Sequence, residues 1–270
     1  MSNITSSVYK MHYMDELAAS DSTIHKLHPI SKLVVTLTFV VTVVSHGKYN
    51  ISGLLPYIFY PAVILSMAEI PFLPIARRIL WISPLVIGVG AFNPVFDRTA
   101  VSIFTGLTVS GGWISFAALL IKGGLAVCAA LLLVATTGIE KIALALRMLK
   151  ISRLFVLQLL LTYRYIFILM EEAGRVWSAY ALRAPGQRGV HFRAWGSLTG
   201  QLLMRTVDRG QRIYQAMSLR GFNGEYNTGA VKRFSITDMA YMCGWSGFFV
   251  ISLAYDLPVL IGAFFTGVMK

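Results

Sequence analysis

Charged residues are scarce in this chain, and their scarcity excludes an ordinary water-soluble domain. Asp, Glu, Lys and Arg make up 13% of the 270 residues, against roughly 25% in soluble domains. Apolar residues make up 56% and the mean hydropathy is +0.66. A surface with so few charges faces something other than water, and the plentiful aromatic and β-branched residues exclude disorder. The composition predicts an integral membrane protein.

Cysteine is also nearly absent. Cys128 and Cys243 lie inside apolar runs without a CxxC spacing, so they indicate small buried residues rather than a disulfide framework or a zinc site. His25 and His28 are three residues apart and share one face if this stretch is helical, but no third ligand lies near them in the sequence. No metal site is predicted in this chain.

Motifs of the common enzyme classes are missing. The chain has no GxxxxGK[ST] phosphate loop and no GxSxG, HExxH or GxGxxG motif, so it does not bind ATP by the phosphate-loop route. Lys122 is the ionisable side chain that interrupts a spanning stretch, which leaves an intramembrane enzyme as a distant alternative. We expect Lys122 to reach the outer surface or to face a partner subunit.

Five apolar stretches approach the length of about 20 residues that a membrane-spanning helix needs. Their apolar residues are continuous rather than alternating, which favours helices over barrel strands. The predicted fold class is an all-α integral membrane protein with about five transmembrane helices plus long cytoplasmic amphipathic helices. The predicted spans are residues 30–45, 51–68, 79–96, 113–137 and 239–255, with a shorter apolar tail at 259–268.

Positive charge is concentrated in one block. Residues 138–233 contain 15 Lys or Arg against 5 Asp or Glu, which accounts for most of the net charge of +12. Basic loops stay in the cytoplasm, so we place this block and the N-terminus there. The chain then divides into an N-terminal tail with four transmembrane helices (1–137), a cytoplasmic helical segment (138–233) and a C-terminal transmembrane helix (234–270).

The basic block is predicted to form three helices. The first follows Gly138 and is amphipathic, since Ile142, Leu146 and Leu149 recur at helical spacing. The second covers about 152–182, and its roughly thirty residues reach about 45 Å. Its first half is apolar, and the sequence leaves open whether this half crosses the membrane, dips into it or lies flat. The third helix covers about 193–219.

The two long helices of this block end alike. Residues 179–184 and 216–221 both read A-x-x-L-R-small, and their arginines are 37 positions apart. The guanidinium offers a rigid fork of donors, the preceding leucine is an apolar anchor, and the small residue lets another backbone approach. Arginine also favours helix C-termini through the helix dipole alone. The repetition favours a docking role for both ends.

Four stretches resemble the transmembrane (T) component of energy-coupling factor transporters, especially the cobalt/nickel branch. They are residues 24–33 (IHKLHPISKL), residues 92–96 (FNPVF), residues 162–166 (TYRYI) followed by Glu171 and Glu172, and the two arginine-containing helix ends. The likeness covers about residues 10–240. It implies a non-catalytic scaffold in the inner (plasma) membrane that joins two ABC-type ATPases to a substrate-binding S component.

The resemblance also implies roles for individual residues. Two tips would engage the ATPases, and four other residues would have structural or partner-subunit roles. The tips are Ala181, Leu182, Arg183 and Ala184, and Ser218, Leu219, Arg220 and Gly221; the other four are Asn93, Pro94, Arg164 and Glu171. ATP and Mg²⁺ would bind to the ATPases, and cobalt or nickel to the S component, so no cofactor is expected here. A T component serving vitamin uptake is the alternative. Nucleic acid is not an expected partner, because that would need a soluble basic domain.

Overall fold

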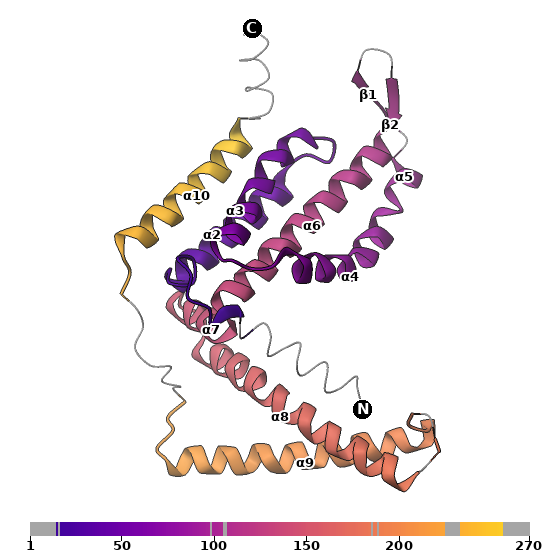
Figure 1. The fold of residues 1–270 in the computed structure, drawn as a ribbon, viewed down its shortest axis with the longest axis vertical. Coiled ribbons are helices and arrows are strands. Elements are labelled where there is room, and N and C mark those ends of the chain that lie inside the picture. The colour runs from indigo at the N-terminus through magenta and orange to yellow at the C-terminus, as the bar shows by residue number, and fades with distance from the viewer. Residues whose placement is uncertain are drawn as a thin grey trace. The chain divides into compact units, whose positions relative to one another are not determined.

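The computed structural model describes residues 15, 17–97, 99–104, 107–184, 186–187, 189–224 and 233–255 (Figure 1). The regular secondary structure of these residues is helical apart from one short β-hairpin, which confirms the predicted all-α fold class. They form two compact units. One unit contains α2 to α6, the hairpin and α10, and is called the bundle below. The other contains Asp15 and α7 to α9, and is called the coupling unit.

The longest helix of the bundle is α6 (Gly111–Thr137), which packs against α2 (Pro29–Ser45) and α4 (Phe72–Gly90). Figure 1 shows α6 running between them. The helix α10 (Ile236–Ala254) also packs on α2. Continuous apolar sequence explains these helices, because a helix satisfies its own backbone groups in lipid.

The second predicted span is not one continuous helix. Residues 51–68 form a 3₁₀ helix, η1 (Ser52–Ile58), followed by the short helix α3 (Phe59–Met67). Pro56 lies inside η1, and proline lacks the N–H group that an α-helix interior requires. The predicted length was therefore right, but the expectation of a single helix was wrong.

The third predicted span begins earlier than expected. The helix α4 starts at Phe72, so Arg77 and Arg78 lie within it rather than in a connecting loop. A short helix, α5 (Asn93–Phe96), follows α4 and leads into the antiparallel strands β1 (Ala100–Phe104) and β2 (Leu107–Ser110). The sequence analysis did not predict this hairpin.

Four of the described helices are long and apolar enough to cross a membrane: Phe72–Phe96, Gly111–Thr137, Arg153–Arg183 and Ile236–Ala254. The apolar helices Pro29–Ser45 and Ser52–Met67 are shorter. The predicted apolar tail at 259–268 lies outside the described residues. These segments agree with a multi-pass membrane protein.

Aromatic side chains form the core of the bundle. Phe39, Tyr57 and Phe249 are fully buried, with ring centroids 5.2–5.8 Å apart, and Tyr60 and Trp245 extend the cluster. The Tyr57 hydroxyl donates to the Phe249 carbonyl at 2.9 Å, so its polar end is satisfied. Each such ring pair adds about 0.5–1.5 kcal/mol beyond buried area. The cluster ties α2, η1, α3 and α10 together.

The coupling unit consists of α7 (Ile139–Met148), α8 (Arg153–Arg183) and α9 (Phe192–Leu219). All three predicted helices are present, with ends within one or two residues of the prediction. Ala143 of α7 packs against Val156 and Leu160 of α8. Lys150 has a φ of +63° between the two helices, where the Ile151 amide donates to the Leu146 carbonyl and closes the end of α7.

Candidate functional site: the α8–α9 hairpin

The predicted docking residues at the end of α8 are exposed. Leu182 is 83% exposed, and Ala181 and Arg183 are exposed beside it. An apolar leucine so exposed loses the stabilisation that burial would give it, about 1.5–3 kcal/mol. The exposed pair of Leu182 and Arg183 therefore offers an apolar anchor and a guanidinium to a partner. We call these residues, with Ala184, the α8 tip.

Tyr180 holds the turn behind the α8 tip. Its hydroxyl donates to Gln187 Oε1 at 2.9 Å and accepts from the His191 amide at 3.3 Å. The backbone amide of Ala184 donates to the Tyr180 carbonyl at 3.0 Å. These contacts fix the chain on both sides of the turn, while Gly186 supplies a positive φ of +93°.

The end of α9 exposes the second docking sequence. Leu219 is 90% exposed, and Ser218, Arg220 and Gly221 are exposed with it. We call these residues the α9 tip. As in the α8 tip, an unburied leucine directly precedes an exposed arginine.

The backbone of the α9 tip explains why glycine follows the arginine. Gly221 has a φ of +78°, its amide donates to the Ser218 carbonyl at 3.0 Å, and the Phe222 amide donates to the Met217 carbonyl at 3.0 Å. This pair of bonds is the Schellman motif, whose left-handed residue favours glycine. No atom lies within 4 Å of a Cβ built on Gly221. Within this chain, glycine is therefore needed for its conformation.

The two tips differ in local geometry. Ala184 caps α8 with φ −124° and ψ 66°, which is not the left-handed conformation of Gly221. The shared sequence therefore produces two exposed Leu-Arg pairs on different backbones.

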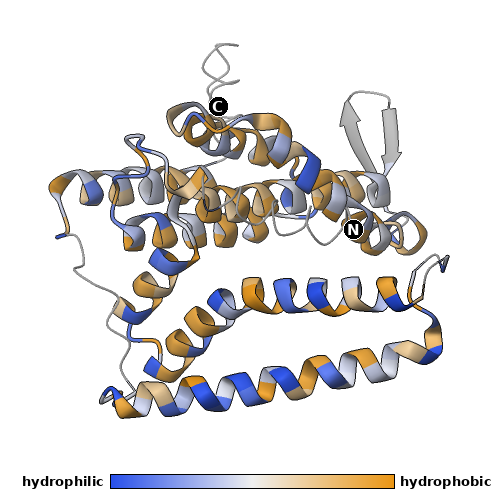
Figure 2. Cartoon of the chain, turned by 60° about the horizontal axis from the view of Figure 1, so that its bottom comes forward, coloured by the Kyte–Doolittle hydropathy of each residue, from blue (hydrophilic) through white to orange (hydrophobic). Residues whose placement is uncertain are grey.

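The length of α9 separates the tips, because the α8 tip lies near the start of α9 and the other tip lies at its end. The 28 residues of α9 correspond to about 42 Å. No residue of α9 is buried, and Phe192, Trp195 and Leu203 are 91%, 50% and 63% exposed. Figure 2 shows apolar and polar residues interspersed along α9. The helix is a long strut, and several of its apolar residues are not covered by its own unit.

An ion-pair cluster joins α8 to α9. The Glu172 carboxylate contacts Arg175 at 2.8 Å and Arg205 of α9 at 2.6 Å. Glu171 and Arg164, for which the resemblance implied structural or partner-subunit roles, both have exposed side chains. The ion-pairing residue is instead Glu172, which the sequence did not single out for such a role. Its spacing of three residues from Arg175 could have predicted their ion pair, because residues three apart lie on the same face of a helix.

Asn93 and Pro94, predicted to be structural, lie where α5 crosses the start of α6. Asn93 Nδ2 donates to Ser115 Oγ at 3.0 Å. A Cβ on Gly112 would lie 2.6 Å from Pro94 Cα and 2.7 Å from the carbonyl oxygens of Asn93 and Asp97. Only glycine fits this backbone approach without displacement.

Asp97 organises the loop beside this crossing. Its carboxylate accepts hydrogen bonds from Lys48 at 2.8 Å, Tyr49 at 2.6 Å and the Thr99 hydroxyl at 2.7 Å. The Lys48 ammonium, with these two hydroxyls, holds the pKa of the Asp97 carboxyl well below its usual range. The loop is thereby tied to the end of α2.

Lys122 has a structural role that the sequence analysis did not foresee. Its ammonium donates to the carbonyl of His46, the C-cap of α2. Lys122 belongs to α6, and a lysine of α2 makes the matching contact. The buried Lys32 of α2 donates to the Thr136 carbonyl near the end of α6 at 2.8 Å. Each lysine thus satisfies carbonyls at the negative end of the other helix.

His28 is the N-cap of α2, and no group of three His, Cys, Asp or Glu side chains that could hold a metal ion is found among the described residues. Its backbone amide donates to the buried Asp238 carboxylate at 2.7 Å, and the Ser235 amide donates to the same carboxylate at 2.9 Å. Asp238 therefore links the starts of α2 and α10.

Comparison with known proteins gives the family. Residues 20–230 match the CbiQ family, whose description is cobalt transport protein. An uncharacterized protein of Methanocaldococcus jannaschii is 25% identical over 193 residues, or 67% of this chain and 66% of that protein. The match therefore covers just under two thirds of that relative's length. The family match includes both described tips.

Proposed function

This chain belongs to the CbiQ cobalt transport protein family, and we propose that it is the transmembrane scaffold of an energy-coupling factor transporter for cobalt. In this proposal, two cytoplasmic ABC-type ATPases bind the α8 tip and the α9 tip. Their ATP-driven motion passes through α8 and α9 to a substrate-binding S component. ATP and Mg²⁺ bind to the ATPases and cobalt to the S component, so this chain transmits motion and catalyses no reaction.

The observation that carries the proposal is the pair of exposed Leu-Arg tips in one unit. Leu182 and Leu219 are 83% and 90% exposed, and each precedes an exposed arginine. Arginine is enriched among the residues that dominate interface energy, and a partner that covers an exposed leucine removes its apolar surface from water. Two similar tips suit two similar partner subunits.

The spacing of the tips supports two separate partners. A separation of about 42 Å along α9 exceeds the reach of a standard interface patch on one small partner. The Glu172 ion pairs to Arg175 and Arg205 connect α8 with α9, so a displacement of one tip acts on both helices.

The proposed location is the inner (plasma) membrane, with the tips in the cytoplasm. The basic residues of 138–233 support this orientation through the positive-inside rule.

Charge reversal at the tips tests the proposal. Arg183→Glu, Arg220→Glu and the double variant should reduce co-purification of the ATPases and lower ATP-dependent uptake of radioactive cobalt. The double variant should lose most uptake, because it removes a favourable contact and adds a repulsive one at both sites. Asp208→Lys is the matched control, since it reverses an exposed charge in the middle of α9, away from both tips.

Membrane insertion and the amount of purified chain should be equal in all variants. The coupling role of the tips is wrong if the double variant retains ATPases and cobalt uptake at the level of Asp208→Lys.

A further inference from the structure

A groove and an adjoining pocket lie between α8 and α9. The groove has a volume of about 840 Å³ and the pocket a volume of about 400 Å³. Four residues line both cavities, which are therefore continuous: Leu169, Thr206, Arg209 and Ile213. The two cavities together form one concave surface of the coupling unit.

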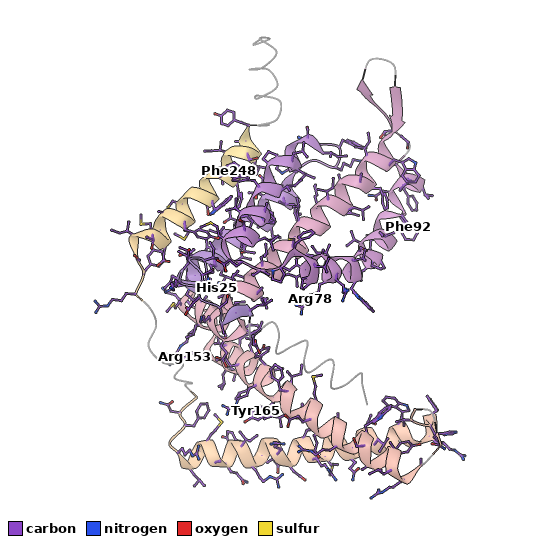
Figure 3. All side chains as sticks on the ribbon, in the orientation of Figure 1. His25, Arg78, Phe92, Arg153, Tyr165 and Phe248 are labelled. Atoms are coloured by element: carbon purple, nitrogen blue, oxygen red, sulfur yellow. The ribbon has the colours of Figure 1, made fainter. Side chains whose placement is uncertain are left out.

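One end of the groove adjoins the α9 tip. Met217, which directly precedes this tip, and residues 222–224, which directly follow it, line the groove together with Arg153 and Leu154 at the start of α8. Figure 3 labels Arg153 there, and Tyr165 farther along the same wall. The start of α8 therefore lies beside the α9 tip, while the end of α8 is the α8 tip.

This arrangement fixes the side of the membrane on which α8 lies in the proposed function. Both tips bind cytoplasmic ATPases in that function, so both ends of α8 are cytoplasmic. A helix with both ends on one side does not cross the bilayer, although α8 is long and apolar enough to do so. A partner that reaches the α9 tip from the cytoplasm therefore also reaches the groove.

The groove presents apolar surface that the coupling unit does not cover. Leu154 and Tyr214, on opposite walls, are 75% and 67% exposed. From Leu154 to Leu169 the groove follows α8 for about 22 Å, or about four turns of a helix. Docking of an amphipathic helix with its apolar side chains in such a groove is a common mode of recognition.

The pocket is basic. Arg205, Arg209 and Arg212 of α9 line it at spacings of four and three residues, which place them on one helix face. Arg205 is paired with Glu172, whereas Arg209 and Arg212 form no ion pair with any residue that the structure describes. Their guanidinium groups suit a carboxylate of a partner, which such a group binds through two donors.

The two tips differ in their surroundings. No residue of the α8 tip lines either cavity, whereas the α9 tip adjoins the groove on both sides in sequence. Two identical partners would therefore meet different surfaces at the two tips.

We propose that the ATPase bound at the α9 tip also places an amphipathic helical segment in the groove. Apolar side chains of this segment pack against Leu157, Leu161 and Met217, and a carboxylate of the same ATPase pairs with Arg209 and Arg212. The inference rests on the proposed docking of an ATPase at the α9 tip. Because the groove adds apolar contact that the α8 tip lacks, the α9 site binds its ATPase more tightly and is occupied first.

Photo-crosslinking in the assembled transporter identifies the occupant of the groove. The photoreactive residue p-benzoylphenylalanine replaces Tyr165 or Tyr214, which line the groove, or Ile166, which is exposed on α8 outside both cavities. Adducts formed on irradiation of intact cells are identified by mass spectrometry. Both groove positions should yield an ATPase peptide, and Ile166 should not. Adducts with a lipid or with another membrane subunit at the groove positions, or an equal ATPase yield from Ile166, overturn the proposal.

Affinities of the single sites test the difference between the tips. Arg183→Glu leaves the α9 tip and Arg220→Glu leaves the α8 tip, so each variant of the full chain in mild detergent is titrated with the ATPase subunit that co-purifies with the unaltered chain. The chain with the intact α9 tip should bind about tenfold or more tightly, as expected for burial of about one more apolar side chain.

Substitutions in the groove separate its contribution from that of the tip. In the Arg183→Glu chain, Met217→Gln keeps the size of a groove-lining side chain but makes it polar, so the affinity should fall about tenfold. Met204→Gln is the matched control, because Met204 is exposed on α9 outside both cavities. In the Arg220→Glu chain, which keeps only the α8 tip, Met217→Gln should have no effect.

The Arg209→Gln/Arg212→Gln variant should weaken the α9 site and make its affinity less sensitive to salt, since salt screens exposed charge pairs. Equal affinities of the two sites, or no effect of either groove variant, overturn the inference and leave the proposed function standing. Undiminished ATPase binding by the Arg183→Glu/Arg220→Glu chain refutes the proposed function and the inference together.

Discussion

Gly112→Ala should destabilise the bundle, because the backbone of α5 occupies the space that a methyl group would need. The new Cβ would lie 2.6 Å from Pro94 Cα and 2.7 Å from the carbonyl oxygens of Asn93 and Asp97. Favourable contacts between carbon atoms are about 3.5–4.0 Å long, so α5 must move by about 1 Å. All three neighbouring atoms belong to backbone, and a change of rotamer cannot relieve the contact.

The expected cost is about 1–3 kcal/mol, the usual range for overpacking a close-packed site. For a chain of this size, each kcal/mol lowers the melting temperature by about 2–4 °C, so the expected decrease is roughly 2–12 °C. Displacement of α5 also strains the Asn93–Ser115 hydrogen bond of 3.0 Å. The measurement is the loss of helical circular dichroism on heating the full chain in one mild detergent.

Gly124→Ala is the matched control. Gly124 lies in the same helix, and no atom lies within 4 Å of a Cβ built there. Alanine should stabilise this helix interior by about 0.5–1 kcal/mol. If both variants melt at the same temperature, the close approach of α5 and α6 at Gly112 does not limit stability, and the reasoning is refuted.

Three further outcomes are expected. Gly221→Ala should cost about 1–2 kcal/mol at the last turn of α9 and increase amide hydrogen exchange there, whereas Gly200→Ala, in the helix interior with open space around it, should not. Lys150→Gly should raise the melting temperature by a few degrees, because it relieves a φ of +63° that costs an L-residue about 1 kcal/mol. Because the pKa of Asp97 is lowered in the folded state, its contribution to stability is complete above the ordinary carboxyl value of about 4 and is lost as the pH falls through the lowered value. Lys48→Gln should reduce that acid-dependent loss in a pH series of melting curves.

The sequence predicted elements where one signal dominated. Continuous apolar runs predicted α2, α6 and α10, and helical spacing with clear breaks predicted α7, α8 and α9. The prediction failed for 51–68, where Pro56 favours a 3₁₀ turn. The prediction also missed the start of α4. The predicted span began only after Arg77 and Arg78, because charged residues are costly inside a membrane, but the helix contains both arginines.

The sequence predicted only those features of the site that depend on neighbouring residues. Leu182 and Leu219, which the repeated sequence marks, are exposed, and their docking role stays a prediction. Contacts between distant residues had no such signal: the pairing of Glu172 with Arg205 depends on how α8 meets α9, and the capping of α2 by Lys122 depends on the antiparallel packing of α6. A single sequence contains no measure of either distance.

The exposure of α9 bears on the proposed scaffold role. A helix of 28 residues with none of them buried gains little from tertiary packing, which normally supplies most helical stability in proteins. Several of its apolar residues, including Trp195 and Leu203, are at least half exposed. Partners that cover them would stabilise α9 and would simultaneously fix the position of the α9 tip. Binding energy from the proposed ATPase partners would then act on this helix, and the stiffness needed to transmit motion would exist only in the assembled transporter.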